Sequence, residues 1–482
     1  MLKIATRPSG RSVIFRVVIA IAITYLAVIQ LRVTFSESSI QQWENVTDSL
    51  PAGSNHGAVD DDGCGGLMDF GHRLVVTVKT GATEAAEKIP IQLETTLRCV
   101  PLENVLWYSD MAQKVGDHQL NDALDQISPS VKDENPDFEI YRKQQDLQDP
   151  LKVVSLLKDM KHPDDENELA AWSLDKYKNI HIVEKSWNAR PHADWYIHID
   201  ADTYVLWPSF MAWIRKLDPS KKSLLGSMAC MKELQFAHGG SGILLSRAAT
   251  ENLVVANNGT AARWDPQIAG NCCGDAILAE AFKELGIPVL NAWPSINGES
   301  PSTIRFESSN WCQPLVTLHH VSTVDAQRLR SFEDKRRSKS VSSPSTPDFQ
   351  PSNSPFQAPI LYSELFADLV WDMLPDSLDN WDNMSDGVTV PNIDSALECI
   401  RACERDGHCL QSLFNGEECK LETTRVTFGV KHELEDDGKT WQSTWNKTRI
   451  AAWVAKQSRC GKVKFPFEDG KTSMSSDMYC PP

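Results

Sequence analysis

Short apolar runs alternate with helical patterns from Leu74 onward. The runs contain few polar residues, which is typical of strands buried on both faces of a sheet. They cover residues 74–78, 105–108, 195–199, 242–245, 287–290 and 315–318. The clearest helical pattern covers residues 276–285, where apolar residues recur on one face, and Gly286 ends it. Strands that alternate with helices predict an α/β domain with a largely parallel sheet.

Two polar stretches interrupt this pattern. Residues 117–168 are acidic with little hydrophobic period, and we interpret them as an insertion with some helix. Residues 331–358 are rich in Ser and Pro and contain the basic run Lys335–Arg337, which is typical of a solvated linker. The chain is therefore expected to form a first domain over residues 67–330 and a C-terminal region over residues 359–482.

The N-terminus carries a basic and then strongly apolar segment. The basic residues are Lys3, Arg7, Arg11 and Arg16, and the apolar run covers residues 17–31. Because positive charge stays on the cytoplasmic side, we predict a cytoplasmic tail over residues 1–12 and a signal anchor over residues 13–33. A cleaved signal peptide is the alternative, but a small-residue cleavage pattern is hard to find. Residues 34–66 then form a stem, and the body faces the lumen of the Golgi or the ER.

The chain has twelve cysteines, which suits an oxidising compartment. Half of them lie near the C-terminus: Cys399, Cys403, Cys409, Cys419, Cys460 and Cys480. Their spacing lacks the paired C-x-x-C pattern of zinc sites, so disulfides are the better interpretation. The sequence also contains four N-x-S/T sequons, which permit glycosylation in the same compartment, at Asn45, Asn258, Asn383 and Asn446.

Composition excludes one class of partner. A chain of 482 residues with 41% hydrophobic residues can bury a core in each of two or three domains. Its formal net charge of -17 argues against nucleic acid, because phosphate-binding surfaces are rich in Lys and Arg.

The most informative segment is Ala193–Tyr204. A buried strand there delivers Asp200 and Asp202 at its carboxyl end, where ligands bind in open α/β sheets. Hard divalent cations such as Mn²⁺ or Mg²⁺ take oxygen ligands and can bridge a diphosphate. The D-x-D pattern alone is weak, since Asp60–Asp62 matches it without a preceding strand. The strand context therefore favours a metal and nucleotide site at Asp200 and Asp202.

Four motifs in a fixed order together resemble a known family. They are Asp200-Ala-Asp202, Gly239-Gly-Ser-Gly-Ile-Leu-Leu-Ser246, Cys272-Cys-Gly-Asp275 and Thr317-Leu-His-His320. This order resembles glycosyltransferase family 31, which includes Fringe and the core-1 β1,3-galactosyltransferase, and its fungal members in particular. The likeness covers about Arg73–Val321. The cysteine-rich segment, about residues 388–445, resembles the PAN/apple-like module of those fungal proteins.

The resemblance implies a GT-A (Rossmann-like) fold and an inverting transfer from a UDP-sugar. Asp275 matches the family's catalytic base, but Gly274 stands where many relatives have an acidic neighbour. The implied metal ligands are Asp200, Asp202 and His319, with His320 as the alternative imidazole. The implied donor contacts are Thr77, Lys79, Thr80, Asp110, Asp200, Ala201, Gly239 and Gly240. The two glycines also favour close approach of a sugar on their own account.

These inferences predict a metal-dependent hexosyltransferase of the secretory lumen. Galactose in a β1,3 linkage is the first expectation, with a glycan or glycoprotein as acceptor. The absence of an acid at Gly274 motivates one alternative, a catalytically dead, lectin-like protein that binds through its cysteine-rich module. A metal-dependent hydrolase is less well supported, because the sequence lacks a clustered ligand set for two metals.

Overall fold

The computed structural model describes residues 73–232, 234–342, 358–433, 440–457 and 459–469. The predicted tail, signal anchor and stem all lie outside these residues. Within the described ranges, no helix combines the length and the apolar character that a membrane span requires.

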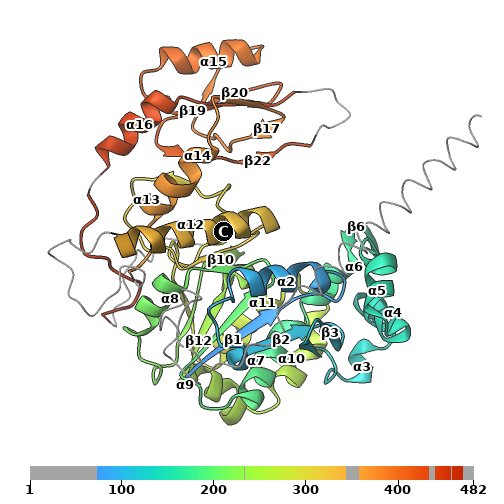
Figure 1. The fold of residues 1–482 in the computed structure, drawn as a ribbon. Helices are drawn as coiled ribbons and strands as arrows, with labels where there is room; N and C mark the ends of the chain where they lie inside the picture. Colours follow the sequence, from blue (N-terminus) through green and yellow to red (C-terminus); the bar gives the residue numbers. More distant parts are fainter. Residues whose placement is uncertain (1–72, 233, 343–357, 434–439, 458, 470–482) are drawn as a thin grey trace, which may run out of the picture. The chain divides into compact units, whose positions relative to one another are not determined.

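The N-terminal region is built on one eight-stranded sheet, in the order β13-β9-β12-β7-β1-β2-β4-β3. Its strands β12, β1, β2 and β3 are labelled in Figure 1. Its strands are β1 (Leu74–Lys79), β2 (Val105–Ser109), β3 (Gln113–Val115), β4 (His118–Asp122), β7 (Trp195–Asp200), β9 (Leu224–Gly226), β12 (Ile243–Ser246) and β13 (Val289–Asn291). Short pairs outside it are β5 (Lys161–His162) with β6 (Asp165–Leu169), β10 (Met228–Met231) with β11 (Leu234–Ala237), and β8 (Tyr204–Val205) with β15 (Thr317–Leu318).

The sheet is mixed rather than largely parallel, which corrects the prediction from sequence. β1 runs parallel to β2 and β7, but β12 lies antiparallel to both β7 and β9. An apolar run indicates that a strand is buried, but it does not indicate whether the strand runs parallel or antiparallel to its neighbours. The run at residues 315–318 is also an exception, because its strand β15 pairs with β8 outside the main sheet.

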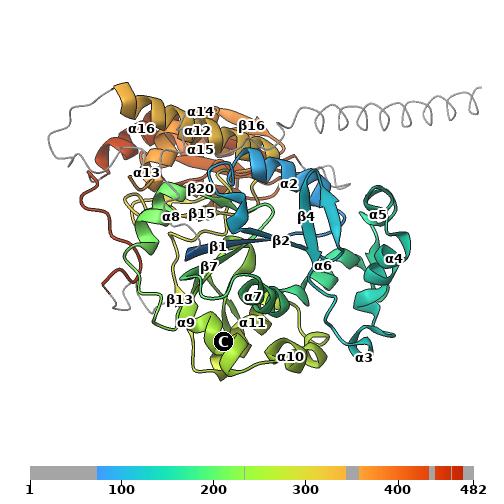
Figure 2. The ribbon, with the colours of Figure 1, turned by 60° about the horizontal axis from the view of Figure 1, so that its bottom comes forward.

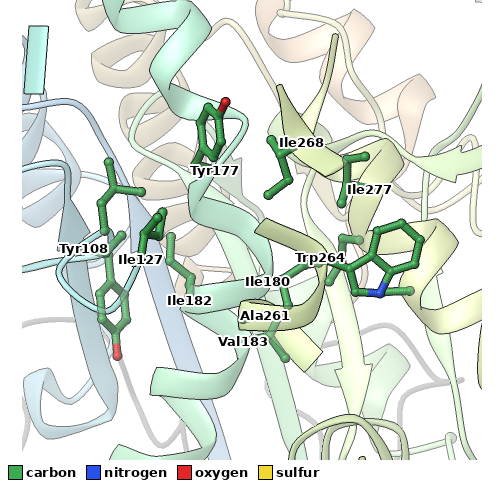
Figure 3. Close-up of a cluster of buried hydrophobic side chains, with 14 of the residues drawn as sticks. Tyr108, Ile127, Tyr177, Ile180, Ile182, Val183, Ala261, Trp264, Ile268 and Ile277 are labelled. Atoms are coloured by element: carbon green, nitrogen blue, oxygen red, sulfur yellow. The ribbon is translucent and has the colours of Figure 1, made fainter. Parts of the chain in front are cut away.

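Helices cover both faces of this sheet (Figure 2). The helices of the N-terminal region are α2 (Ala85–Glu94), α3 (Pro129–Lys132), α4 (Glu139–Leu147), α5 (Pro150–Leu157), α6 (Ala170–Asp175), α7 (Lys178–Ala189), α8 (Trp207–Ile214), α9 (Arg247–Glu251), α10 (Thr260–Ile268) and α11 (Gly274–Glu284). Of these, α3, α4 and α5 lie beyond the β4 side of the sheet (Figure 2). Leu74, Val76 and Val78 of β1 join a core with α2 and α8. Val75 joins the opposite core, where side chains of α7, α10 and α11 point toward one another (Figure 3). Residues 117–168 contain α3 to α5, as predicted, but the segment is not wholly an insertion, because its first residues form β4 of the main sheet.

Helix α12 (Thr323–Ser342) replaces the first part of the predicted linker. The basic run lies on this helix. Arg336 donates from Nε to Glu364 Oε1 at 2.6 Å and is only 11% exposed. Leu329 and Phe332 of the same helix are buried. The composition of residues 331–342 predicted a linker, but these residues belong to a helix. The ion pair of Arg336 and the buried side chains of Leu329 and Phe332 hold this helix in place.

The C-terminal region contains a second, five-stranded sheet in the order β16-β23-β19-β20-β18. Its strands are β16 (Ser377–Asp379), β18 (Val388–Val390), β19 (Gln411–Phe414), β20 (Cys419–Glu422) and β23 (Gln442–Trp445), and the short strands β17 (Trp381–Asp382) and β22 (Val430–Lys431) pair separately. Its helices are α13 (Tyr362–Leu365), η7 (Phe366–Val370), α14 (Trp371–Met373), α15 (Ala396–Arg405) and α16 (Lys447–Lys456).

Disulfides staple this region as the cysteine pattern predicted. Cys399 bonds Cys419 and thereby ties α15 to β20, and Cys403 bonds Cys409. Cys460 bonds Cys312 of the N-terminal region. Cys480 lies outside the described residues.

The two regions share buried contacts. The strand β14 (Phe306–Glu307) pairs with β21 (Arg425–Val426). Tyr204 and Phe306 belong to one hydrophobic core with Val426 and Trp445. The C-terminal sheet is therefore a distinct sheet, but its core is continuous with apolar residues of the N-terminal region.

Candidate active site

The carboxyl ends of β1 and β7 form the floor of the site. The two strands pair in parallel with Lys79 opposite Asp200, so both residues reach the same edge of the sheet. The chain turns directly after Asp200, and buried Thr203 holds this turn. Its Oγ1 accepts from the backbone N–H of Asp200 at 3.0 Å and donates to the carbonyl of Gly240 at 2.7 Å. Thr203 therefore joins the D-x-D turn to the glycine loop, and a hydroxyl residue just after a strand is its only sequence signal.

Asp202, His319 and His320 form a group that can hold a metal ion. Their ligand atoms all lie within 4.8 Å of one another. His319 Nε2 is 3.3 Å from Asp202 Oδ1, and His319 Nδ1 is buried without a partner among the described residues. A carboxylate with two imidazoles is a ligand set that can bind a divalent cation. The residues present therefore fit a divalent cation, and they do not select one metal.

Two backbone features make this group possible. A Cβ at Gly240 would lie 2.1 Å from His319 Nε2, so only glycine leaves room for the imidazole. Successive residues of a strand point to opposite faces. However, β15 ends at Leu318, and His320 has a φ of 51°. This left-handed conformation brings the His319 and His320 rings to a centroid distance of 3.8 Å. The sequence offered His319 and His320 as alternative metal ligands, and the structure places both of them in the candidate metal group.

Asp200 stands apart from this group. Its Oδ1 lies 3.3 Å from Lys79 Nζ, and Lys79 also forms an ion pair with Asp175. Burial raises the pKa of Asp200, against the effect of the Lys79 charge. Asp202 and His319 of the predicted metal set thus lie together with His320, and the role of Asp200 as a metal ligand stays a prediction.

Lys88 was not identified from the sequence, although it contacts the metal group. Its ammonium lies 3.2 Å from Asp202 Oδ2 and 2.8 Å from Glu84 Oε2. Burial opposes ionisation of Asp202, but the hydrogen bond from His319 and the charge of Lys88 outweigh it and lower the pKa of Asp202. Asp202 is therefore held as a carboxylate, the form that binds a cation. The only signal of Lys88 in the sequence is its i,i+4 spacing from Glu84 on α2.

Asp275 lies in the first turn of α11, where the helix dipole favours an ionised carboxylate. Its Oδ2 accepts from the backbone N–H of Gly239 at 2.8 Å. The neighbouring Gly274 is buried, and a Cβ there would lie 2.3 Å from the carbonyl oxygen of Lys176. The backbone of Lys176 therefore explains why no acidic side chain precedes Asp275.

The predicted donor contacts separate into two sets. Thr77, Lys79, Asp200 and Gly239 line one small cavity of about 20 Å³, together with His198. Burial lowers the pKa of His198 to about 3, and neither of its ring nitrogens has a partner among the described residues.

The other predicted donor contacts are engaged within the protein. Asp110 is fully buried, accepts from the Ala82 N–H at 2.6 Å and lies 3.5 Å from Lys178 Nζ. Thr80 Oγ1 donates to Glu84 Oε1 at 3.2 Å. Ala201 is also buried. Their contacts with a nucleotide remain predictions.

A family model described as Fringe-like matches residues 72–292. The matched range contains the D-x-D turn, the glycine loop and Asp275, and it ends before His319. No curated protein matches the chain.

Proposed function

We propose that the chain, whose residues 72–292 match the Fringe-like family, is a glycosyltransferase that transfers a sugar from a UDP-sugar to a glycan or glycoprotein. One observation carries the proposal. Gly239 bonds the candidate base Asp275, and the next residue, Gly240, makes room for the imidazole of His319. A base and a metal group thus flank a single glycine pair.

The reaction that this arrangement supports is a direct displacement with inversion. Asp275 accepts the proton of an acceptor hydroxyl, and the hydroxyl oxygen forms a bond to the anomeric carbon. The bond between that carbon and the β-phosphate oxygen breaks, and UDP leaves with the electron pair. Asp202, His319 and His320 would hold Mn²⁺ or Mg²⁺, and a bound cation offsets the charge of the departing diphosphate.

The chain's own residues support each role. The Gly239 N–H fixes one oxygen of Asp275, and the start of α11 stabilises its charge. Lys79 and Lys88 hold Asp200 and Asp202 in place with ion pairs of 3.3 and 3.2 Å. Gly239, which lies next to Asp275, and Gly240 carry no side chain that would keep a sugar away from Asp275.

The finer parts of the proposal concern substrate and compartment. UDP-galactose is the first donor we propose, with a β1,3 linkage to the acceptor. We also propose a single-pass type II protein of the Golgi or ER membrane, anchored by residues 13–33. The disulfides of the C-terminal region support an oxidising lumen. The PAN/apple-like module is proposed to position the acceptor.

The lectin-like alternative loses its main support. It was motivated by the missing acid at position 274, but packing against Lys176 accounts for Gly274 without any loss of the base. A two-metal hydrolase needs a second ligand group. A single group of three candidate ligands is found in the parts of the chain that the structure describes.

The test is to incubate the full chain with a panel of UDP-sugars and Mn²⁺ and to measure released UDP. We expect release with one donor, stimulation by an acceptor glycoside and loss on chelation of the metal. A protein that UDP and Mn²⁺ together do not stabilise against heat, and that releases no UDP, would contradict the proposal.

A further inference from the structure

A disulfide between adjacent cysteines lies directly before the candidate base. Cys272 bonds Cys273, and Asp275 follows two residues later. Two residues span at most roughly 7 Å, so the Cα atom of Cys273 lies within that distance of the Cα atom of Asp275. Cys272 is exposed, and Cys273 is partly buried at the N-cap of α11. A rigid, uncharged pair of sulfur atoms is therefore accessible beside the base.

The hairpin of β10 and β11 extends this surface. Met231 Sδ lies 3.2 Å from Cys272 Sγ. Met231 and Cys273 also pack against the buried cluster of Phe236, Ala276 and Ala279. Met231 is itself partly exposed. We call Cys272, Cys273 and Met231 the sulfur patch.

Different segments of the chain connect Asp275 to the sulfur patch and to the metal group. Gly239 and Gly240 connect Asp275 to His319, whereas Cys273 and Cys272 connect it to the hairpin. In a displacement with inversion, the attacking oxygen and the leaving oxygen lie on opposite sides of the anomeric carbon. The diphosphate belongs with the metal group, so the acceptor must reach Asp275 from elsewhere.

We propose that the sulfur patch binds the apolar C–H face of the acceptor sugar and holds its hydroxyl against Asp275. This inference rests on the proposed function. Thioether and disulfide sulfur atoms are polarisable and apolar, so they pack well against C–H groups. They also add no charge beside the carboxylate that must take the proton. The patch thus serves acceptor recognition and has no part in donor binding.

The experiment uses the full chain, UDP-galactose or the donor that the panel selects, and p-nitrophenyl glycosides as acceptors. The first variant replaces Cys272 and Cys273 together by Ser, which leaves no unpaired thiol. The second is Met231→Ser, which keeps the disulfide. Val255→Ser is the matched control, because Val255 is an apolar residue of η5 (Asn252–Ala256) that is 56% exposed.

Loss of ground-state contacts raises KM and leaves kcat unchanged. We expect the double variant to raise the acceptor KM about tenfold and Met231→Ser to raise it about threefold, each with unchanged kcat. The affinity for UDP with Mn²⁺ should stay constant in both. The control should keep the wild-type KM.

Several outcomes would overturn the inference. One is a normal acceptor KM in both variants, or a fall in kcat and UDP affinity without a change in KM, which would indicate a structural role only. Another is free thiols at Cys272 and Cys273 in non-reducing peptide mapping. A third is a wild-type chain that hydrolyses the donor but uses none of the glycosides. If the wild-type chain neither binds nor cleaves any UDP-sugar, the proposed function fails instead.

Discussion

The N-terminal and C-terminal regions are stabilised in different ways. The N-terminal region packs helices on both faces of an eight-stranded sheet, and each face has its own large core. The C-terminal region has a five-stranded sheet, two internal disulfides and a small cysteine-lined core, and it shares a further core with the N-terminal region. All candidate catalytic groups lie on the N-terminal region. The comparison teaches that the polar site is built where two large cores enclose the sheet that carries it.

The largest expected effect is a loss of turnover when Asp275 is replaced, while the affinity for the nucleotide is kept. Asp275→Asn should lower turnover by about 10²- to 10⁴-fold, because general-base help contributes about that much. Its affinity for UDP with Mn²⁺ should stay close to that of the wild type, since among the described residues Asp275 accepts hydrogen bonds from the backbone N–H groups of Gly239 and Ala276 and not from the metal group. Steady-state kinetics and calorimetry measure the two effects. Glu280→Gln on the same helix is the control, and unchanged turnover in Asp275→Asn would remove the base assignment.

The second prediction tests how the two regions are coupled. Removal of the Cys312–Cys460 disulfide, which closes 148 residues, should lower the free energy of unfolding by roughly 4 to 5 kcal/mol. Removal of Cys399–Cys419, which closes 20 residues, should cost roughly 3 kcal/mol. Paired Ser variants and denaturant titration give both values. Equal or reversed costs would show that loop length does not govern their contribution.

A third prediction concerns Gly274. Gly274→Ala should lower the free energy of unfolding by about 1 to 3 kcal/mol, because its Cβ would meet the Lys176 carbonyl at 2.3 Å. Gly270→Ala is the matched control, since a Cβ there has no neighbour within 4 Å. The control should be neutral or slightly stabilising. A Gly274→Ala variant as stable as the control would refute the steric explanation for the missing acid.

The effect that is smallest at neutral pH is a pH dependence within the N-terminal core. The folded pKa of His198, about 3, lies below the unfolded value of about 6.5. The unfolded chain then binds a proton that the folded chain does not, so this stabilising contribution is present above pH 6.5 and is lost as the pH falls toward 3. His198→Gln should be less sensitive to acid over this range in thermal unfolding. Parallel curves for both proteins would argue against a neutral, buried imidazole.

Much of the N-terminal region could be predicted because burial leaves a local pattern. The apolar runs located β1, β2, β7 and β12, and the D-x-D pattern marked the edge of the sheet where the site lies. The direction of β12 could not be predicted, since it depends on the path of the whole chain. The helical residues 331–342 were missed because their anchor, Glu364, is remote in sequence from Arg336.

The site itself was only partly predictable, for the same reason. Lys88 pairs with Asp202 across 114 residues, and no local pattern reveals such an ion pair. His320 joins His319 only because its backbone is left-handed. The motif order, by contrast, singled out Asp202, His319 and Asp275, and the structure brings these residues close to Gly239 and Gly240, while their roles stay predictions.

The central claim is that a metal group and a separate base together make this site a transferase, and calorimetric binding of UDP tests it most directly. The titration compares the wild type, Asp202→Ala and the exposed control Asp165→Ala, each with Mn²⁺ and with chelator. We predict tight binding only with Mn²⁺ in the wild type and the control, and loss of the Mn²⁺ effect in Asp202→Ala, because the cation and the diphosphate bind together. Equal UDP affinity with and without Mn²⁺, or an Asp202→Ala variant that retains the Mn²⁺ effect, would contradict the account.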